Sequence, residues 1–102
     1  MSDILVEKTI TGSGQWSEAI RLKGNFLAEV RADAVSATFN LQRRRNAADT
    51  WQTVTKDDTG AAKAITGAGQ FVGVEVTKEG AEYRIGCSAW TSGTNVVVSI
   101  TQ

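Results

Sequence analysis

The sequence predicts an all-β protein: a single-domain antiparallel β-sandwich spanning residues 1–102. Apolar and polar residues alternate in run after run, as they do in half-buried strands, and no stretch of ten or more residues has apolar side chains at helical spacing. Clusters of Gly, Asn and Asp, which favour tight turns, recur at intervals of roughly 8–12 residues. This spacing is typical of sandwiches and barrels. We expect about eight strands in a jelly-roll-like arrangement, with an immunoglobulin-like sandwich as the alternative.

The expected strands follow one another along the chain with short turns between them. The clearest alternation lies in residues 35–43, where Phe39 and Leu41 share one face and Asn40 and Gln42 share the other. Residues 1–10 are a candidate N-terminal arm or edge strand. The other expected strands are residues 3–10, 14–22, 25–32, 49–55, 70–77, 82–90 and 94–101. Residues 60–68 fit a short strand, a loop or one turn of helix.

Side-chain alternation also assigns faces to the later strands. In residues 70–77 three valines lie on one face, with Gly73 and Glu75 on the other. The last two expected strands each have an apolar face, and we expect the turn at residues 91–94 to join them into a closing hairpin. These two apolar faces consist of Tyr83, Ile85 and Cys87, and of Val96, Val98 and Ile100.

Length and charge point to one domain that associates with itself. The 102 residues are 41% hydrophobic and 22% charged, which is ordinary for a folded chain, and the net charge is zero. A neutral chain lacks the basic footprint of a nucleic-acid-binding domain and has little self-repulsion between copies. The chain also has no proline, a residue that often protects edge strands. We therefore expect edge pairing with a neighbour, as in a dimer or trimer.

The residue types that the sequence lacks exclude several classes of function. Histidine is absent, which removes the Ser-His-Asp and Cys-His catalytic sets, histidine metal ligands and the commonest general base. The single cysteine, Cys87, can form neither an internal disulfide nor a four-cysteine zinc site. No signal peptide or membrane helix is recognisable. We expect a protein that is not an enzyme, has no cofactor or metal, and contacts neither nucleic acid nor membrane.

Arg43, Arg44 and Arg45 form the strongest charge cluster. A contact with phosphate or with an acidic partner surface is one interpretation. The other, which we favour, is a solvated hairpin end where alternate arginines point outward and lay their stems over apolar surface.

The acidic residues suggest two sites, neither of which the sequence favours. Asp57 and Asp58 resemble a fragment of a calcium loop, but the residues after them lack the alternating ligands and distal glutamate of an EF-hand. Glu75, Glu79 and Glu82 could supply the carboxylate pair of a glycosidase. Because the chain has no cleft-forming insertion, we interpret these glutamates as surface charges.

The remaining candidates are best explained by packing. Cys87 alternates with apolar residues and is interpreted as a small buried hydrophobe. Arg84 falls on the opposite face, where it pairs with an acidic residue or covers the outer surface of the sheet. Trp16, Trp51 and Trp90 are interpreted as core or rim packing, with a carbohydrate platform as the alternative.

Taken in order, several short motifs resemble a known group of proteins. A strand ending in Leu-Gln-Arg precedes a Trp and Val pair, then a Tyr-Arg-Ile-Gly strand and a Thr-Ser-Gly turn. This order resembles the small β-sandwich virion proteins of tailed bacteriophages, of the capsid decoration or cement type, over roughly residues 35–101. The matching residues are Leu41, Gln42, Arg43, Trp51, Val54, Tyr83, Arg84, Ile85, Gly86, Thr91, Ser92 and Gly93.

The resemblance implies a virion component that is synthesised in the host cytoplasm. Its expected function is that of a decoration protein, which oligomerises and stabilises the head by bridging subunits of the major capsid protein. The alternative is a tail or head-fibre module that binds host-surface carbohydrate. The candidate partner-contact residues are Ile4, Leu5, Arg43, Arg44, Arg45 and Trp90.

Overall fold

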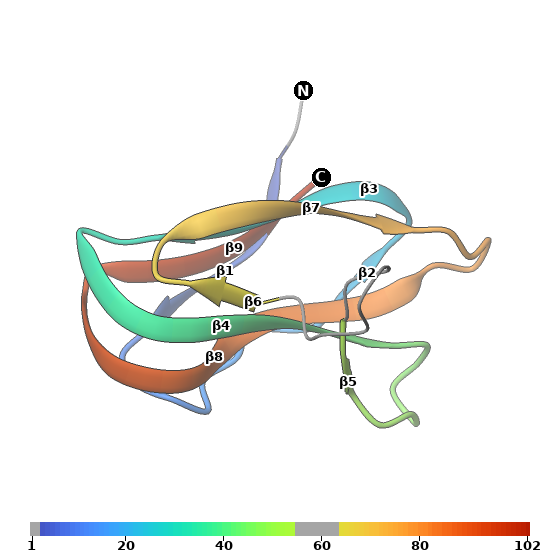
Figure 1. Ribbon diagram of the computed structural model, residues 1–102. Coiled ribbons are helices and arrows are strands. Elements are labelled where there is room, and N and C mark those ends of the chain that lie inside the picture. Colours follow the sequence, from blue (N-terminus) through green and yellow to red (C-terminus); the bar gives the residue numbers. More distant parts are fainter. Residues whose placement is uncertain (1–2, 55–63) are drawn as a thin grey trace.

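The protein is a β-sandwich of two antiparallel sheets, as predicted (Figure 1). The structure, a computed structural model, describes residues 3–54 and 64–102. Within these residues the regular elements are strands, and no helix has the length and hydrophobicity needed to cross a bilayer. The strands are β1 (Ile4–Ile10), β2 (Ile20–Leu22), β3 (Gly24–Arg31), β4 (Ala34–Arg44), β5 (Gln52–Thr53), β6 (Ala64–Thr66), β7 (Gly69–Glu75), β8 (Ala81–Thr94) and β9 (Val96–Thr101).

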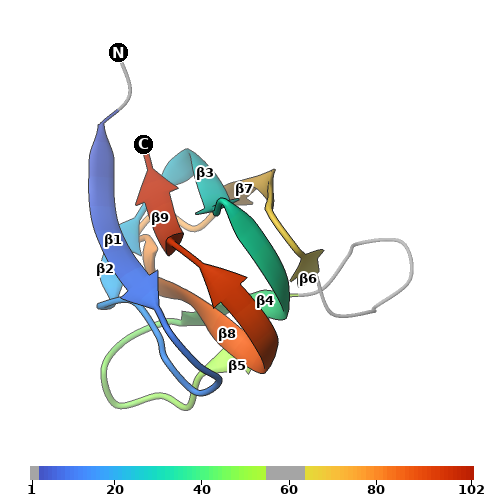
Figure 2. The same ribbon diagram turned by 90° about the vertical axis from the view of Figure 1, so that its left-hand side faces the viewer.

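The strand order is that of a jelly roll. One sheet has the order β1-β9-β3-β7 and the other β2-β8-β4-β5, with β6 also paired to β4 (Figure 2). The pairings are nested: β4 pairs with β5 and β6, β3 with β7, β2 with β8, and β1 with β9. The two halves of the chain therefore form one long antiparallel ribbon, which is wound so that β1 to β4 fall in alternate sheets. This order fits the jelly-roll-like prediction rather than the immunoglobulin-like alternative.

The core lies between the two sheets and follows the predicted alternation. On β4, Phe39 and Leu41 are buried while the residues between them face outward. The apolar faces predicted for β8 and β9 are buried as well, which confirms both assignments. The core consists of Ile10, Leu22, Phe26, Ala28, Val30, Phe39, Leu41, Ile65, Ala81, Tyr83, Ile85, Cys87, Val96, Val98 and Ile100.

Two predicted strands are shorter than expected. Of residues 14–22, the last three form β2, while the part before them follows β8 through isolated bonds such as Ser17 N to Ile85 O at 2.8 Å. Because the buried Ser17 hydroxyl also accepts the Ile85 N–H, it replaces part of a regular ladder. Of residues 49–55, the structure describes 49–54, and within these Gln52–Thr53 is the strand. In the ambiguous stretch 60–68, Ala64–Thr66 is a short strand, and residues 60–63 lie outside the described part.

The predicted closing hairpin is wrong. β8 continues through the expected turn as far as Thr94, and β9 begins at Val96. Asn95 has a φ of 53°, and at this residue the chain crosses from one sheet to the other. β8 pairs with β2 and β4, whereas β9 pairs with β1 and β3. Long-range pairing with the N-terminal half has replaced the local hairpin that the turn signal suggested.

The N-terminal stretch is an edge strand. Residues 4–10 pair with β9 along one side, so of the two alternatives for this region the structure has the strand. The strand is tied to the end of the chain, because Asp3 and Gln102 exchange two backbone hydrogen bonds of 2.9 Å each. The outermost strands of this sheet are thus β1 and β7 (Figure 2).

Candidate functional site

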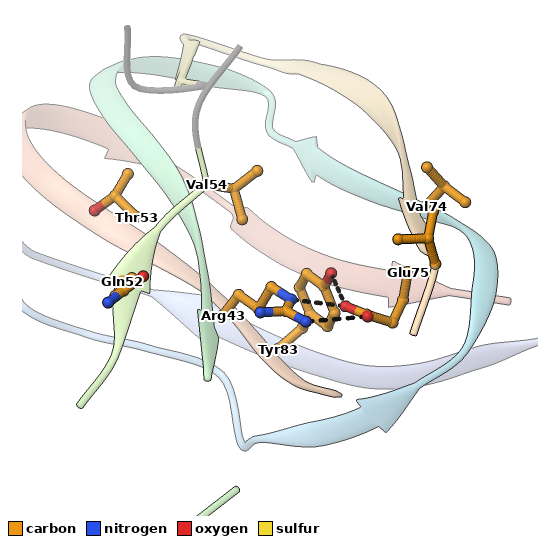
Figure 3. A pocket seen from close by; sticks show the side chains of 8 residues that line it. Arg43, Gln52, Thr53, Val54, Val74, Glu75 and Tyr83 are labelled. Carbon is orange, nitrogen blue, oxygen red and sulfur yellow. Dashed lines mark hydrogen bonds and ion pairs between the residues drawn. The ribbon is translucent and has the colours of Figure 1, made fainter. Parts of the chain in front are cut away.

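An open pocket of about 300 Å³ lies where β5 of one sheet faces β7 of the other (Figure 3). Arg43 of β4 extends across it toward Glu75 of β7, with Tyr83 of β8 alongside. The pocket therefore brings together residues from both sheets. Its rim consists of Gln52, Thr53 and Val54 on one side and Val74 and Val76 on the other.

The centre of the pocket is an ion pair between Arg43 and Glu75. Arg43 donates from Nε to Oε1 at 2.7 Å and from Nη2 to Oε2 at 3.0 Å. The Glu75 side chain is 1% exposed and the Arg43 side chain 32% exposed. The expectation that Glu75 is a surface charge is therefore wrong. The side-chain period of β7 turns Glu75 inward, and the arginine compensates the buried charge.

Two further side chains complete the coordination of the Glu75 carboxylate. The Tyr83 hydroxyl donates to Oε1 at 2.7 Å. The Thr77 backbone N–H donates to Oε2 at 3.0 Å, and the Thr77 hydroxyl donates to the same oxygen. With Arg43 included, five donors reach the two carboxylate oxygens. Such a carboxylate has no lone pair left for a substrate.

This arrangement shifts the pKa values of all three principal groups. Hydrogen bonding to Arg43, aided by Thr77 and Tyr83, holds the pKa of Glu75 well below its usual range despite burial. The bond to Glu75 raises the pKa of Arg43. Burial, with the neighbouring Glu75 charge, raises the pKa of Tyr83 to about 12. At neutral pH Glu75 is ionised and Tyr83 neutral, so neither group is poised to exchange a proton.

A glycine and two aromatic rings support the pocket from behind. Phe26 of β3 lies opposite Gly73 of β7, and a Cβ on Gly73 would lie 2.4 Å from Phe26 Cζ. The Phe26 ring packs against Tyr83 with the ring centroids 4.7 Å apart. Gly73 therefore allows Phe26 to occupy the space beside Tyr83, which positions the Tyr83 hydroxyl for Glu75.

A second group of side chains lies on the outer face of the sheet that contains β4 and β8. Arg44 stacks on the Trp51 ring at 4.3 Å, and Arg84 stacks on Trp51 and on Trp16, at 4.6 Å in each case. We call Arg44, Trp51, Arg84 and Trp16 the stacked cluster. Gly86 makes room for it, because a Cβ there would lie 2.6 Å from Trp16 Cδ2. Arg84 thus covers the outer sheet surface, one of its two predicted roles.

The structure separates the three consecutive arginines. Arg43 points inward to Glu75, while Arg44 faces outward and binds Glu82 at 2.9 Å. Arg45 is exposed beyond the end of β4. The favoured interpretation of a solvated hairpin end holds for Arg45 and is wrong for Arg43, because alternation places Arg43 on the core side of the strand.

The candidate partner-contact residues do not form one surface. Ile4 and Leu5 are 54% and 39% exposed on the edge strand β1. The arginines lie at one end of β4, whereas Trp90 pairs with Ala37 six residues or about 20 Å farther along that strand. Trp90 is partly buried and packs against the core.

Exposed valines on β7 and directly after it form a surface that was not among the contact residues predicted from the sequence. Val72, Val74 and Val76 are 65%, 56% and 85% exposed, and the last two border the pocket. The alternation of Glu75 with the valines did not reveal this surface, because a charge favours the outer face and the valines would then be buried. The structure has the reverse orientation, because Arg43 and Tyr83 provide the partners that Glu75 needs inside.

The described residues also bear on the remaining candidates. Cys87 is buried, as predicted, and burial raises the pKa of its thiol. Glu79 is exposed, whereas Glu82 is half-buried and pairs with Arg44 and Arg21. Asp57 and Asp58 lie outside the described residues. Among residues 3–54 and 64–102, no group of three or more His, Cys, Asp or Glu side chains is placed to hold a metal ion.

No family model, curated protein or solved structure matches the chain.

Proposed function

We propose that this protein is a structural component of a tailed-bacteriophage particle, namely a capsid decoration protein. In this function it oligomerises and stabilises the head by bridging subunits of the major capsid protein. The bacteriophage assignment rests on the sequence resemblance over residues 35–101. Jelly rolls occur in viral capsid domains, which is compatible with the proposal, although a fold alone does not define a function.

The observation that carries the proposal is the placement of exposed apolar side chains on both outermost strands of one sheet. Ile4 and Leu5 lie on β1, and Val72 and Val74 lie on β7, with Val76 directly after it. A bridging protein needs two separate contact surfaces, and these strands provide one at each edge. Exposed apolar groups of this kind favour contact with another protein.

A bridging function also agrees with the chemistry of the pocket. The Glu75 carboxylate is saturated with donors, so the pocket stiffens the β7 edge and leaves no group ready for catalysis. A stiff edge loses little conformational freedom when it docks. Binding to the assembled lattice stabilises that lattice by mass action, and weak contacts repeated over many copies add up.

The first experiment asks whether the protein belongs to the particle. Mass spectrometry of purified virions, with cryo-electron microscopy of the same sample, should find the chain in many copies on the head. Particles that lack the protein should lose DNA at lower temperature and regain stability when purified protein is added back. Absence of the chain from the particle would contradict the proposal, and a location on the tail would contradict the decoration function.

The second experiment separates the two contact surfaces. We expect Val74→Lys with Val76→Lys, and Ile4→Lys with Leu5→Lys, each to remove one contact and retain the other. Light scattering measures self-association, and co-sedimentation with heads measures capsid binding. Ser13→Lys, in the exposed turn after β1, is the matched control and should change neither. If both double variants retain both activities, these edges are not the contact surfaces.

Carbohydrate binding by a tail or head-fibre module is the second proposal. It needs an aromatic ring with a face that is open to a sugar. The rings of Trp16 and Trp51 stack with arginine, and Trp90 packs on the core. These contacts compete with a sugar, so we rank this function second. A glycan array distinguishes it: binding that is lost in Trp51→Ala and kept in Trp51→Phe would favour the fibre module.

A further inference from the structure

Arg84 lacks a counterion among the described residues. Its Nε donates to Gln42 Oε1 at 2.8 Å, and its Cζ lies 4.6 Å from the ring centroids of both Trp16 and Trp51. The ion pairs formed by residues 3–54 and 64–102 do not include Arg84, and no acceptor for its two terminal nitrogens is found there. Within residues 3–54 and 64–102, the terminal N–H groups of Arg84 therefore meet no acceptor.

The neighbouring charges increase this imbalance. Arg44 and Arg21 share one carboxylate, Glu82, at 2.9 Å and 3.7 Å. In the strand register Arg21 and Arg44 both lie opposite Glu82, and Arg84 is the next outward-facing residue of β8. Of the three guanidinium groups on this face, those of Arg21 and Arg44 therefore share the Glu82 carboxylate, and Arg84 has no ion pair with a described residue.

A guanidinium without an ion pair among the described residues is costly in this position. Burial and the nearby Arg44 charge lower the pKa of Arg84. A partly desolvated charge is normally compensated by an opposite charge or by acceptors for its protons. Here the two tryptophan rings hold the guanidinium in place, and an acidic group of a partner would supply this compensation.

Glu18 is an acidic residue of the chain that could compete for Arg84. It lies two positions after Trp16, in the segment that bridges to β8 at Gly86. Glu18 does not pair with Arg84; it borders a separate pocket next to β1, together with Leu5 and Trp16.

We propose that the stacked cluster is a docking site for a carboxylate side chain of an acidic partner protein, bound by the terminal N–H groups of Arg84. The planar fork of a guanidinium matches the two oxygens of a carboxylate, and the two neighbouring rings restrict the positions that the Arg84 guanidinium can adopt. A nucleic acid fits less well, because a neutral chain offers too few cations for a polyanion. The inference stands apart from the decoration function, since any partner with an acidic surface would suit it.

The test measures binding of a capped tetraglutamate peptide to the full chain by NMR. The reporters are the Arg84 Nε–H signal and the indole N–H signals of Trp16 and Trp51. We expect all three to shift with one saturating curve, and a capped tetraglutamine peptide to leave them unchanged. Arg84→Gln should weaken binding by about tenfold or more, as expected for loss of a charge-assisted bond. Arg84→Lys keeps the charge without the planar fork, so its affinity for the peptide should lie between those of the unmodified protein and Arg84→Gln.

Two variants act as controls. Arg45→Gln removes the same charge from an exposed position just beyond β4, and it should change the affinity by less than about twofold. Glu18→Gln should leave the affinity unchanged. The backbone spectrum of each variant shows whether it is folded. If Arg84→Gln unfolds, the affinity of Arg84→Lys and the reporter shifts in the unmodified protein still show whether Arg84 binds the peptide.

Four outcomes would overturn the inference. The first is no saturable shift at millimolar peptide, and the second is an equal loss of affinity in Arg45→Gln and Arg84→Gln. The third is a gain in affinity in Glu18→Gln together with a shift of the Arg84 signal in the absence of peptide, which would make Glu18 the partner of Arg84. The fourth is tighter binding of inorganic phosphate or of an RNA oligonucleotide than of the peptide, which would assign the site to another class of ligand.

Discussion

Arg43 and Glu75 join the two sheets of the sandwich through a bidentate ion pair, with N–O distances of 2.7 Å and 3.0 Å. Arg43 belongs to β4 and Glu75 to β7, and the two strands are in different sheets. Tyr83 and Thr77 bind the same carboxylate, so the Glu75 carboxylate is fully hydrogen-bonded. The main consequence is structural: a charge that is buried at the edge of one sheet attaches this edge to the other sheet.

The first prediction concerns removal of the Glu75 charge. Glu75→Gln keeps the size of the side chain but leaves Arg43 facing an amide instead of a carboxylate. Loss of one partner of a buried ion pair is strongly destabilising, although the partial exposure of Arg43 reduces the cost. We expect the free energy of unfolding, measured in urea, to fall by about 2–4 kcal/mol.

Glu79→Gln is the matched control for this experiment. Glu79 is an exposed glutamate only four residues away, and its side chain forms no ion pair with any residue of the described ranges. We expect its replacement to change the free energy of unfolding by no more than about 0.5 kcal/mol. Equal losses in the two variants would show that Arg43 and Glu75 do not stabilise the sandwich as a pair.

The second prediction concerns acid. The pKa of Glu75 is lower in the folded protein than in the unfolded chain, where it is about 4.3. The stabilisation is therefore complete above the unfolded value and is lost as pH falls below it, progressively between about pH 5 and pH 2. In urea titrations over this range, the unmodified protein should lose stability more steeply than Glu75→Gln. Parallel curves would contradict the assignment, because other carboxylates contribute equally to both proteins.

The third prediction concerns alkali and uses the single tyrosine of the chain, Tyr83. Its pKa is raised to about 12 in the folded protein, against about 10 in an unfolded chain. The stabilisation is complete below pH of about 10 and is lost as the pH rises toward about 12. Ultraviolet absorbance of tyrosinate should show these two midpoints without and with urea. Glu75→Gln should lower the folded midpoint, and an unchanged midpoint would argue against contact between the two groups.

The sequence was sufficient to predict the parts of the fold that depend on local alternation. On β4, β8 and β9 the apolar residues occupy every second position, and a strand with one apolar face has one stable orientation in a sandwich. The turn predicted at residues 91–94 shows where local patterns are not sufficient. Residues 91–94 have the composition of a hairpin turn, yet β8 and β9 belong to different sheets. Strand order depends on pairing between distant segments, which local composition does not record.

The pocket was beyond prediction for the same reason. Arg43 and Glu75 are 32 residues apart, and neither has a neighbour in sequence that reveals the pair. Alternation in residues 70–77 separated the valines from Glu75 correctly, but it could not show which face was buried. Hydrophobicity favours the valine face, and the structure buries the other because Arg43 and Tyr83 lie opposite it.

The fourth prediction concerns Gly73, where β7 meets the core. A methyl group there would lie 2.4 Å from Phe26 Cζ, and the packing of the Phe26 ring on Tyr83 limits how far Phe26 can move away. We expect Gly73→Ala to lower the free energy of unfolding in urea by about 1–3 kcal/mol, the usual cost of overpacking a core. Gly12→Ala is the control, since a Cβ there meets nothing within 4 Å. Combining Gly73→Ala with Phe26→Leu should cost less than the sum of the two changes, because the smaller side chain leaves room for the methyl group. A Gly73→Ala protein as stable as the Gly12→Ala control would show that Phe26 does not depend on this glycine.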